Sequence, residues 1–384
     1  MNPIYDQMPT TIFEVMSGLA RQTGAVNLGQ GFPDGPGPLD IRQAAADAVL
    51  NGYNQYPPMA GLAELRLAVA DHYRRFQGLD LDGLSEVTVT SGATEAIAAA
   101  LFALIVPGDE VVLIQPLYDA YLPLVQRAGG VPRLVSLQPP HWHLTEEMLE
   151  AAITPRTRLV LFNNPLNPAG KVHGKDDLAA LARVCVKHDL IAISDEVWEH
   201  VTFDGHTHTP LMAMPGMRDR TVKIGSAGKM FALTGWKVGF VCAAPRLNAI
   251  VAKAHQFLTF TTPPNLQTAV AFGLSKGPDF FDAQRQALSR SRDRLTLGLR
   301  QEGYVTLPSD GTYFVNVDLM ASGIAVDDET FCRRAVQEAG VATIPVSSFY
   351  AEDPVRHVVR LCFSKQDATL DAGISALAKA KRLF

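Results

Sequence analysis

A lysine at the end of an apolar run is the side chain of this sequence best suited to covalent chemistry. Lys229 follows the apolar residues 221–225 in a turn of small residues, and a second apolar run covers residues 238–242. A lysine in such a place is partly desolvated, and desolvation lowers the pKa of its ammonium group. The neutral amine can attack a carbonyl and form a Schiff base. The alternative is a surface lysine at a strand end.

Two polar neighbours indicate that an anion lies beside this amine. Ser226 precedes Lys229 by three residues, and Lys237 follows it by eight. A hydroxyl group and a second cation so close along the chain would suit a phosphate. Pyridoxal phosphate (PLP) combines a phosphate with a reactive aldehyde, so the segment favours PLP as its ligand.

Two further polar residues follow apolar runs that read as strands. Asp195 ends the run 190–195. A carboxylate there could pair with the pyridinium nitrogen and keep it protonated, which PLP needs to accept electrons. Its alternative is a helix cap or a loop salt bridge. Asn167 lies in the segment 163–170, and its amide could donate to a phenolate oxygen. Its alternative is a Pro-Gly turn with nothing bound.

An anion site and an isolated arginine complete the chemical groups. Residues 90–96 lie where a strand gives way to an Ala-rich helix, and Gly92 permits the tight turn that exposes N–H groups to a phosphate. Thr94 as an ordinary N-cap is the alternative. Arg360 lies in the apolar strand 358–363 and needs a carboxylate partner, which is either a ligand or an internal ion pair.

Alternating short apolar runs and helical segments must position these groups. We expect strands at 87–90, 111–114, 133–135, 159–162, 190–193, 222–224 and 238–242. We expect helices between them at 94–104, 117–127, 145–152 and 178–188. Such alternation predicts an α/β fold with βαβ units and a mostly parallel sheet covered on both faces.

The chain length and the later pattern predict more than one domain. A chain of 384 residues suggests about two domains. After residue 303 the pattern becomes α+β, with strands expected at 304–307, 312–317 and 357–363. We predict an N-terminal arm and helix at 1–38, a large domain at 39–285 and a small C-terminal domain at 286–384.

Composition argues against several other classes of protein. A net charge of -5 does not favour binding to nucleic acid or to an anionic membrane. No apolar run reaches 18 residues, so we expect no membrane-spanning helix. No signal peptide is visible, and the four scattered cysteines suit a reduced, cytoplasmic protein. The histidine pairs 141/143 and 206/208 lie in polar loops without a third ligand, so we expect solvated histidines and no metal site.

The order of these motifs resembles the class I/II PLP-dependent aminotransferases of fold type I, from about residue 10 to the end. The segments 27–34 and 226–237 are similar to the branch that contains kynurenine, glutamine and methionine aminotransferases and some N-succinyldiaminopimelate aminotransferases. The resemblance implies a mostly parallel seven-stranded sheet in the large domain, a smaller α+β C-terminal domain, and a homodimer with shared active sites.

The resemblance also implies roles in holding PLP. Lys229 would carry PLP as a Schiff base and move a proton, Asp195 would pair with the pyridine nitrogen, and Tyr118 would stack on the ring; these are the expected catalytic residues. Val197 would cover the other ring face, and Asn167 would donate to the ring oxygen. The phosphate would be held by Ala93, Thr94, Ser226, Lys237 and Tyr56 of the partner subunit.

Substrate contacts and one departure follow from the same resemblance. The α-carboxylate would bind Arg360, Asn167 and the Gly31 backbone. The side-chain pocket would be lined by Phe13, Phe32 and the partner's Phe260. The family usually has tyrosine three residues after the aspartate, whereas this chain has Trp198. Its indole N–H either substitutes for that hydroxyl or leaves Asn167 alone to tune the cofactor.

The expected activity is transfer of an amino group from an L-amino acid to a 2-oxo acid by a ping-pong mechanism. Residues 259–264 contain no arginine for a distal carboxylate, which favours apolar, aromatic, kynurenine-like, methionine or glutamine donors over aspartate. Alternatives within the fold are an N-succinyldiaminopimelate aminotransferase and a cysteine-conjugate β-lyase. An α/β binding protein without PLP is the alternative outside the enzymes.

Overall fold

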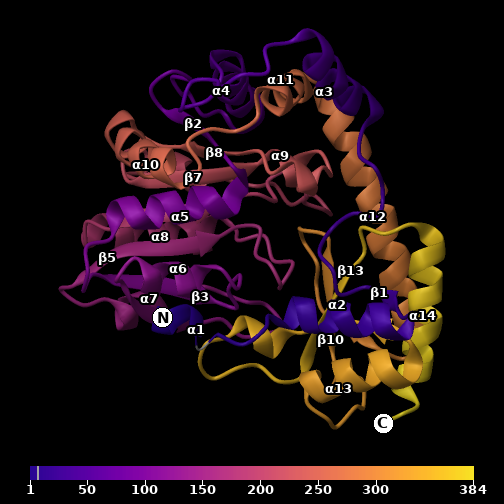
Figure 1. The fold of residues 1–384 in the computed structure, drawn as a ribbon. Helices are drawn as coiled ribbons and strands as arrows, with labels where there is room; N and C mark the ends of the chain where they lie inside the picture. Colours follow the sequence, from indigo (N-terminus) through magenta and orange to yellow (C-terminus); the bar gives the residue numbers. More distant parts are fainter. Residues whose placement is uncertain (7) are drawn as a thin grey trace.

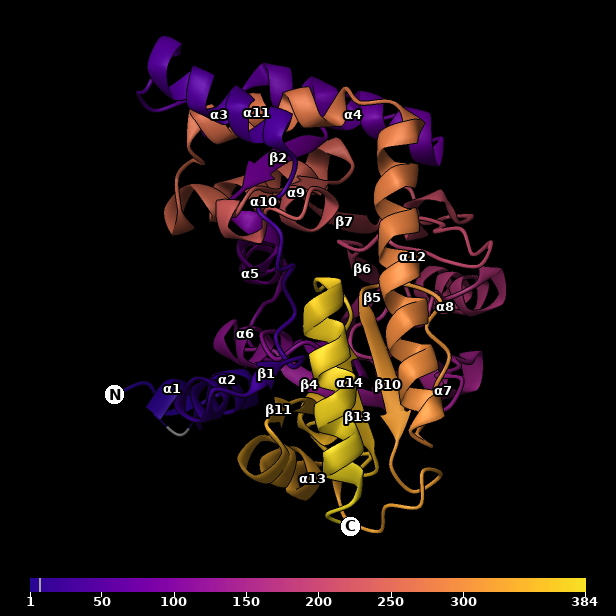
Figure 2. The same ribbon diagram turned by 90° about the vertical axis from the view of Figure 1, so that its right-hand side faces the viewer.

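The computed structural model describes residues 1–6 and 8–384, and its main features are two β-sheets joined by a long helix (Figure 1). One sheet has seven strands and the other has four. Helix α12 (Pro278–Gln301) runs between them and packs against α14 (Asp367–Lys381) beside the smaller sheet (Figure 2). We call the region around the seven-stranded sheet the large part and the region around the four-stranded sheet the small part.

The seven-stranded sheet is parallel except at one strand. Its order is β2-β8-β7-β6-β5-β3-β4, and β8 runs antiparallel to both of its neighbours. The strands are β2 (Val87–Thr90), β3 (Glu110–Gln115), β4 (Val131–Ser136), β5 (Thr157–Asn163), β6 (Ile191–Asp195), β7 (Thr221–Ser226) and β8 (Gly239–Cys242). The predicted α/β class and the predicted mostly parallel sheet are therefore confirmed.

Helices cover both faces of this sheet, which explains why its strands are apolar runs without polar alternation. Along β3, Val112 packs with α8 on one face, and Val111 and Leu113 pack with α5 on the other. The helices of the large part are α3 (Leu39–Asn51), α4 (Ala63–Gln77), α5 (Gly92–Leu104), α6 (Tyr121–Arg127), α7 (Glu146–Ala152), α8 (Lys175–Lys187), α9 (Ala227–Met230), α10 (Pro245–Leu258) and α11 (Pro264–Leu274).

The small part is an antiparallel sheet backed by helices. Its strand order is β12-β13-β10-β9. The strands are β9 (Val305–Thr306), β10 (Phe314–Asp318), β12 (Ile344–Pro345) and β13 (Val358–Cys362), and α13 (Asp328–Arg334) lies beside them. Arg360 in β13 pairs in register with Asn316 of β10 and Ile344 of β12. The arginine therefore lies on one of the two central strands of this sheet.

The N-terminal segment is attached to the small part. After α1 (Pro3–Asp6), helix α2 (Ile12–Thr23) begins at an N-cap, Thr11, and ends at Gly24 in the left-handed region. Strand β1 (Val26–Asn27) then pairs in parallel with β11 (Val341–Ala342). The loop that follows, residues 28–32, is thereby brought to the edge of the small sheet, next to Arg360.

The structure departs from the predicted elements at one place near the carboxyl edge of the sheet. The helix expected at 117–127 begins at Tyr121, and residues 117–120 are not helical, with a turn at 119–120. Among the described residues, no helix combines the length and apolar character that crossing a membrane requires. The cysteines are all free and buried, at positions 185, 242, 332 and 362.

Candidate active site

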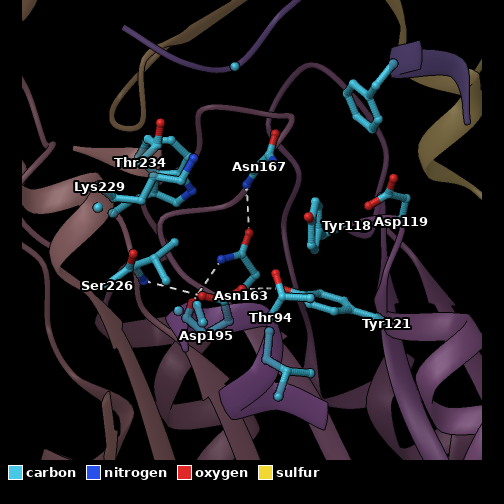
Figure 3. Close-up of a pocket in the computed structure, with 18 of the residues that line it drawn as sticks. Thr94, Tyr118, Asp119, Tyr121, Asn163, Asn167, Asp195, Ser226, Lys229 and Thr234 are labelled. Carbon is cyan, nitrogen blue, oxygen red and sulfur yellow. Dashed lines mark hydrogen bonds between the residues drawn. The ribbon is translucent and has the colours of Figure 1, made fainter. Parts of the chain in front are cut away.

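A cavity of about 400 Å³ lies at the carboxyl ends of the parallel strands, between the large part and the small part (Figure 3). Parallel sheets bind ligands at this edge because their strand ends and following loops converge there. The cavity brings together the predicted site residues Phe13, Gly31, Ala93, Thr94, Tyr118, Asn167, Asp195, Val197, Trp198, Ser226, Lys229, Lys237 and Arg360. Residues from opposite ends of the chain therefore face one space.

Lys229 carries the reactive amine on the short helix α9, directly after β7. Its Nζ donates a hydrogen bond to the hydroxyl oxygen of Tyr313 at 3.1 Å and lies 4.7 Å from the ring centre of Trp198. Desolvation is the main cause that lowers the pKa of Lys229 from 10.5 to about 8; the charge of Arg360 acts in the same direction, and Cys362 and Asp195 act against it. The predicted desolvated lysine is therefore present.

Asp195 forms the floor of the cavity at the end of β6. Burial raises the pKa of its carboxyl to about 6, although two donors favour the ionised form. The hydroxyl of Tyr121 donates to Oδ2, and the backbone N–H of Val197 donates to Oδ1 at 3.4 Å. A buried carboxylate with this pKa is ready to pair with a cation that enters the cavity.

Asn163 connects the carboxylate strand to the neighbouring loop. Its Nδ2 donates to the backbone oxygen of Asp195 at 2.9 Å, and its Oδ1 accepts from the backbone N–H of Asn167 at 2.8 Å (Figure 3). These two bonds fix the position of the Asn167 loop over the end of β6. Asn163 was part of the expected motif, but its linking role was not predicted.

The first turn of α5 carries groups that can bind an anion. Gly92 has φ +75°, and a Cβ there would lie 3.3 Å from Cε of Lys237. The cavity is lined by the first residues of this helix, whose N–H groups have no partner within the helix, by Lys237, and by Ser226 and Thr94. Backbone donors and a cation at a helix start are the set that binds a phosphate.

Arg360 is buried without any carboxylate partner. Only 1% of its surface is exposed, and no Asp or Glu oxygen of residues 1–6 and 8–384 lies within 4.0 Å of it. Its Nη1 donates to Oδ1 of Asn167 and its Nη2 to the backbone oxygen of Gly29, both at 2.9 Å. Desolvation lowers its pKa to about 10. The internal ion pair considered above is therefore excluded for the described part, and the guanidinium remains available to a carboxylate in the cavity.

Three predicted site residues, one for the phosphate and two for the side-chain pocket, do not line the cavity of the single chain. Tyr56 and Phe260 are exposed at the surface, with their ring centres 5.3 Å apart. Phe32 is also exposed, and its ring lies 4.9 Å from Nζ of Lys365. The roles expected for Tyr56 and Phe260 depend on a partner subunit. These two roles, and the role of Phe32 in the side-chain pocket, stay predictions.

Several residues of the site were not identified from the sequence. Asp119, Tyr121 and Phe314 line the cavity, and Tyr313 contacts Lys229 from behind it. Tyr121 follows Tyr118 by three residues, and this spacing in a polar turn was the one available signal. Tyr313 and Phe314 lie in a segment whose apolar character indicated only a strand core. Further lining residues are Thr11, Gln30, Ile97 and Thr234.

One prediction about histidines is wrong. His208 was expected to be solvated, but it is buried and its Nε2 lies 2.8 Å from Oε2 of Glu196. The reason is that Glu196, at the end of β6, reaches the loop that holds His208. Lys223 lies in the same cluster and donates to Glu196 at 2.6 Å and to Glu199 at 2.7 Å. The ammonium group thus forms an ion pair with both carboxylates of this cluster.

The residues around the cavity fit PLP. The helix start with Ser226 and Lys237 can hold a phosphate, Asp195 can face a ring nitrogen, and Tyr118 can cover a ring face from across the cavity (Figure 3). The Nε of the buried Arg360 has no hydrogen-bond partner among the described residues, so it is free to donate to a polar ligand group.

Comparisons with known proteins agree with this arrangement. Residues 23–377 match the family model described as Aminotransferase class I and II. The chain is 45% identical over 381 residues to a probable N-succinyldiaminopimelate aminotransferase of Mycobacterium tuberculosis, with 96% of each chain covered. It is 42% identical over 378 residues to the methionine aminotransferase of Escherichia coli, with 98% of this chain and 96% of that one covered.

A solved structure shares the whole architecture. The N-succinyldiaminopimelate aminotransferase from Mycobacterium tuberculosis superimposes with a TM-score of 0.96 at 45% identity, covering 99% of this chain and 100% of that one. A likeness of this extent includes both parts of the molecule.

Proposed function

The chain belongs to the class I and II aminotransferases, which are PLP-dependent enzymes of fold type I, and we propose the substrates that it takes and the residues that act on them. We propose that it moves the amino group of an L-amino acid with an apolar, aromatic or amide side chain to a 2-oxo acid. The observation that supports this assignment most is that Lys229, Asp195 and the unpaired Arg360 face one cavity.

PLP supplies an aldehyde that accepts the amino group and a protonated ring that withdraws electrons from the substrate Cα. Asp195 would hold the proton on the ring nitrogen, because its buried carboxylate gains a cation there. The first turn of α5, with Ser226 and Lys237, would hold the phosphate, and Tyr118 and Val197 would enclose the ring. Asn167 would donate to the ring oxygen through its amide nitrogen, since its Oδ1 accepts from Arg360.

The substrate would be oriented by its α-carboxylate. The planar guanidinium of Arg360 matches a carboxylate in a bidentate manner, and burial strengthens the pairing. Lys229 would then take the proton from the substrate Cα and later return it. A pKa of about 8 leaves part of the amine neutral near neutral pH, and this form is the one that acts as a base.

The charges that line the cavity favour uncharged substrate side chains. Among the described lining residues the cations are Lys229, Lys237 and Arg360, and all three have roles at the cofactor or the α-carboxylate. The carboxyl group of Asp119 also lines the cavity (Figure 3). A distal carboxylate on the substrate would therefore meet repulsion and find no partner.

A donor panel tests the proposed substrate class. Single half-reactions with methionine, phenylalanine, kynurenine, glutamine and aspartate are followed by the loss of the cofactor's visible absorbance, with Lys229→Ala as the inactive control. We expect kcat/KM for aspartate to be the lowest. A higher value for aspartate than for the other four donors would overturn the assignment.

The similarity to a probable N-succinyldiaminopimelate aminotransferase supports a second candidate function. That substrate carries an α-carboxylate for Arg360 and further carboxylates at a distance. The same panel with N-succinyl-L,L-diaminopimelate and glutamate separates the two functions. A kcat/KM for the succinylated substrate above that for methionine would favour the second candidate.

We further propose that the enzyme is a cytoplasmic homodimer. Tyr56 and Phe260 pack together at the surface, and Phe257 is exposed near them on the last turn of α10. Large exposed aromatic side chains of this kind are typical of an interface. The free, buried cysteines suit a reducing compartment. Light scattering coupled to gel filtration measures the oligomeric state.

A further inference from the structure

We propose that Tyr313 is a positioning residue that holds the free amine of Lys229 and ties it to the loop that carries Gly31. The inference rests on the proposed function of Lys229 as the base. It concerns the steps in which this amine is not covalently engaged.

The Tyr313 hydroxyl donates one hydrogen bond and accepts another. Its hydrogen is donated to the backbone oxygen of Gly31 at 2.6 Å, so a lone pair faces Nζ of Lys229 at 3.1 Å. The side chain is 2% exposed, and burial raises the pKa of the phenol well above 10. The phenol therefore stays protonated and orients the amine without acting as a base itself.

The amine has no other hydrogen-bond acceptor among the described residues. Trp198 lies beside it, but an indole offers a donor and a ring face and no acceptor atom. The ring of Tyr313 contacts that indole edge to face at 4.3 Å, which fixes the phenol's direction. In the family a tyrosine usually stands at position 198. In this chain the hydroxyl that contacts the amine belongs to Tyr313.

The loop at residues 28–32 joins this contact to the carboxylate site. Arg360 donates to the backbone oxygen of Gly29, two residues before the oxygen that Tyr313 holds. The loop is tightly packed, because a Cβ at Gly31 would lie 2.9 Å from the ring of Phe314. Tyr313 therefore connects the base in the large part with the guanidinium in the small part, through one short segment.

Removal of the Tyr313 hydroxyl should lower the pKa of Lys229. In Tyr313→Phe the ring and its contact with Trp198 remain, but the ammonium form of Lys229 loses its acceptor. We expect the pKa of Lys229 in the cofactor-free full-length chain to fall by about one unit. This pKa is measured by NMR after 13C reductive methylation, with Lys229→Ala to assign the signal.

Turnover should also fall, because the amine of Lys229 would no longer be held in position. For the holoenzyme we expect kcat to fall about 10- to 100-fold, with little change in the KM of the amino donor. The matched control is Tyr304→Phe, because Tyr304 is also a buried phenol of the small part, and it donates to the backbone oxygen of Leu377 at 2.8 Å far from the cavity. The control should leave both the pKa of Lys229 and kcat unchanged.

Unchanged pKa and kcat in Tyr313→Phe would overturn the proposal. The pKa is measured without cofactor or substrate, so this outcome is distinct from a failure of the donor panel, which would count against the proposed function. If Tyr313→Phe does not fold, a crystal structure of the cofactor-free wild-type chain decides. A separation of more than about 3.5 Å between Nζ and the phenol oxygen would then contradict the inference.

Discussion

At the scale of single residues, the carboxyl group of Asp195 is the clearest case of a group whose ionised form is disfavoured by burial. Burial raises its pKa from 3.8 to about 6, so the folded chain binds this proton more tightly than the unfolded chain does. The stabilisation that the proton provides is fully present below pH 3.8, and it is lost as the pH rises through about 6. A cation beside the carboxylate would restore it.

Asp195→Asn should therefore stabilise the cofactor-free chain at pH 8, on the order of 2 kcal/mol, and much less at pH 4. Urea unfolding at the two pH values measures this difference. The matched control is Asp328→Asn, because burial also raises the pKa of Asp328 to about 6, outside the cavity. Both variants should change the pH dependence, but only Asp195→Asn should lose PLP affinity. An equal effect of Asp195→Asn at both pH values would count against this account.

Asp119 makes a separate prediction about substrate choice. Its carboxyl group lines the cavity, and Asp119→Asn removes a negative charge with little change in size. We expect kcat/KM for glutamate to rise about three- to ten-fold relative to methionine. Competition between the two donors in one reaction measures the ratio directly. No change in that ratio would show that Asp119 does not select the substrate.

At the scale of elements, the start of α5 depends on the conformation of one glycine. Gly92→Ala forces a side chain into φ +75° and places its Cβ 3.3 Å from Cε of Lys237. We expect a loss of stability of about 1 kcal/mol and a weaker Kd for PLP, measured by fluorescence titration.

Gly78 provides the matched control for this change. It ends α4 at φ +65°, and a Cβ there would meet nothing within 4 Å. Gly78→Ala should lose a similar stability and keep the Kd for PLP. If both variants bind PLP equally well, the first turn of α5 does not hold the phosphate.

The elements themselves were largely predictable, because buried parallel strands are short apolar runs between helices. The exception at residues 117–120 has a physical reason. The residue types at 117–120 are compatible with a helix, so the local sequence predicts one. In the structure these residues are not helical, and Tyr118 and Asp119 line the cavity. Tyr313 could not be predicted for a related reason, since a tyrosine in an apolar strand indicates a core residue, and only the packing of the small part against the large part brings it to Lys229.

At the scale of the whole molecule, the site is incomplete if Tyr56 acts on a partner subunit. In mixed dimers of Lys229→Ala and Tyr56→Ala chains, one of the two sites would combine an intact Lys229 with an intact Tyr56. Random mixing should therefore restore about a quarter of wild-type activity. The assay compares the mixture with each variant alone. No recovery above the separate variants would contradict shared sites.

The cavity is also a property of the whole chain, and this limits what sequence can show. Arg360, Asp195 and Gly31 come from the small sheet, the large sheet and the N-terminal loop, and no local pattern sets the distances between them. Their types and order still predicted the cofactor. The absence of a carboxylate next to Arg360 among the described residues became visible only when β13 was placed against its neighbours.

The measurement that tests the central claim most directly is the covalent position of the cofactor. The holoenzyme is treated with borohydride, which reduces an imine between PLP and a lysine, and its peptides are mapped by mass spectrometry. The account predicts a single phosphopyridoxyl group on Lys229. The same group on Lys237, on Lys223 or on no lysine would contradict it.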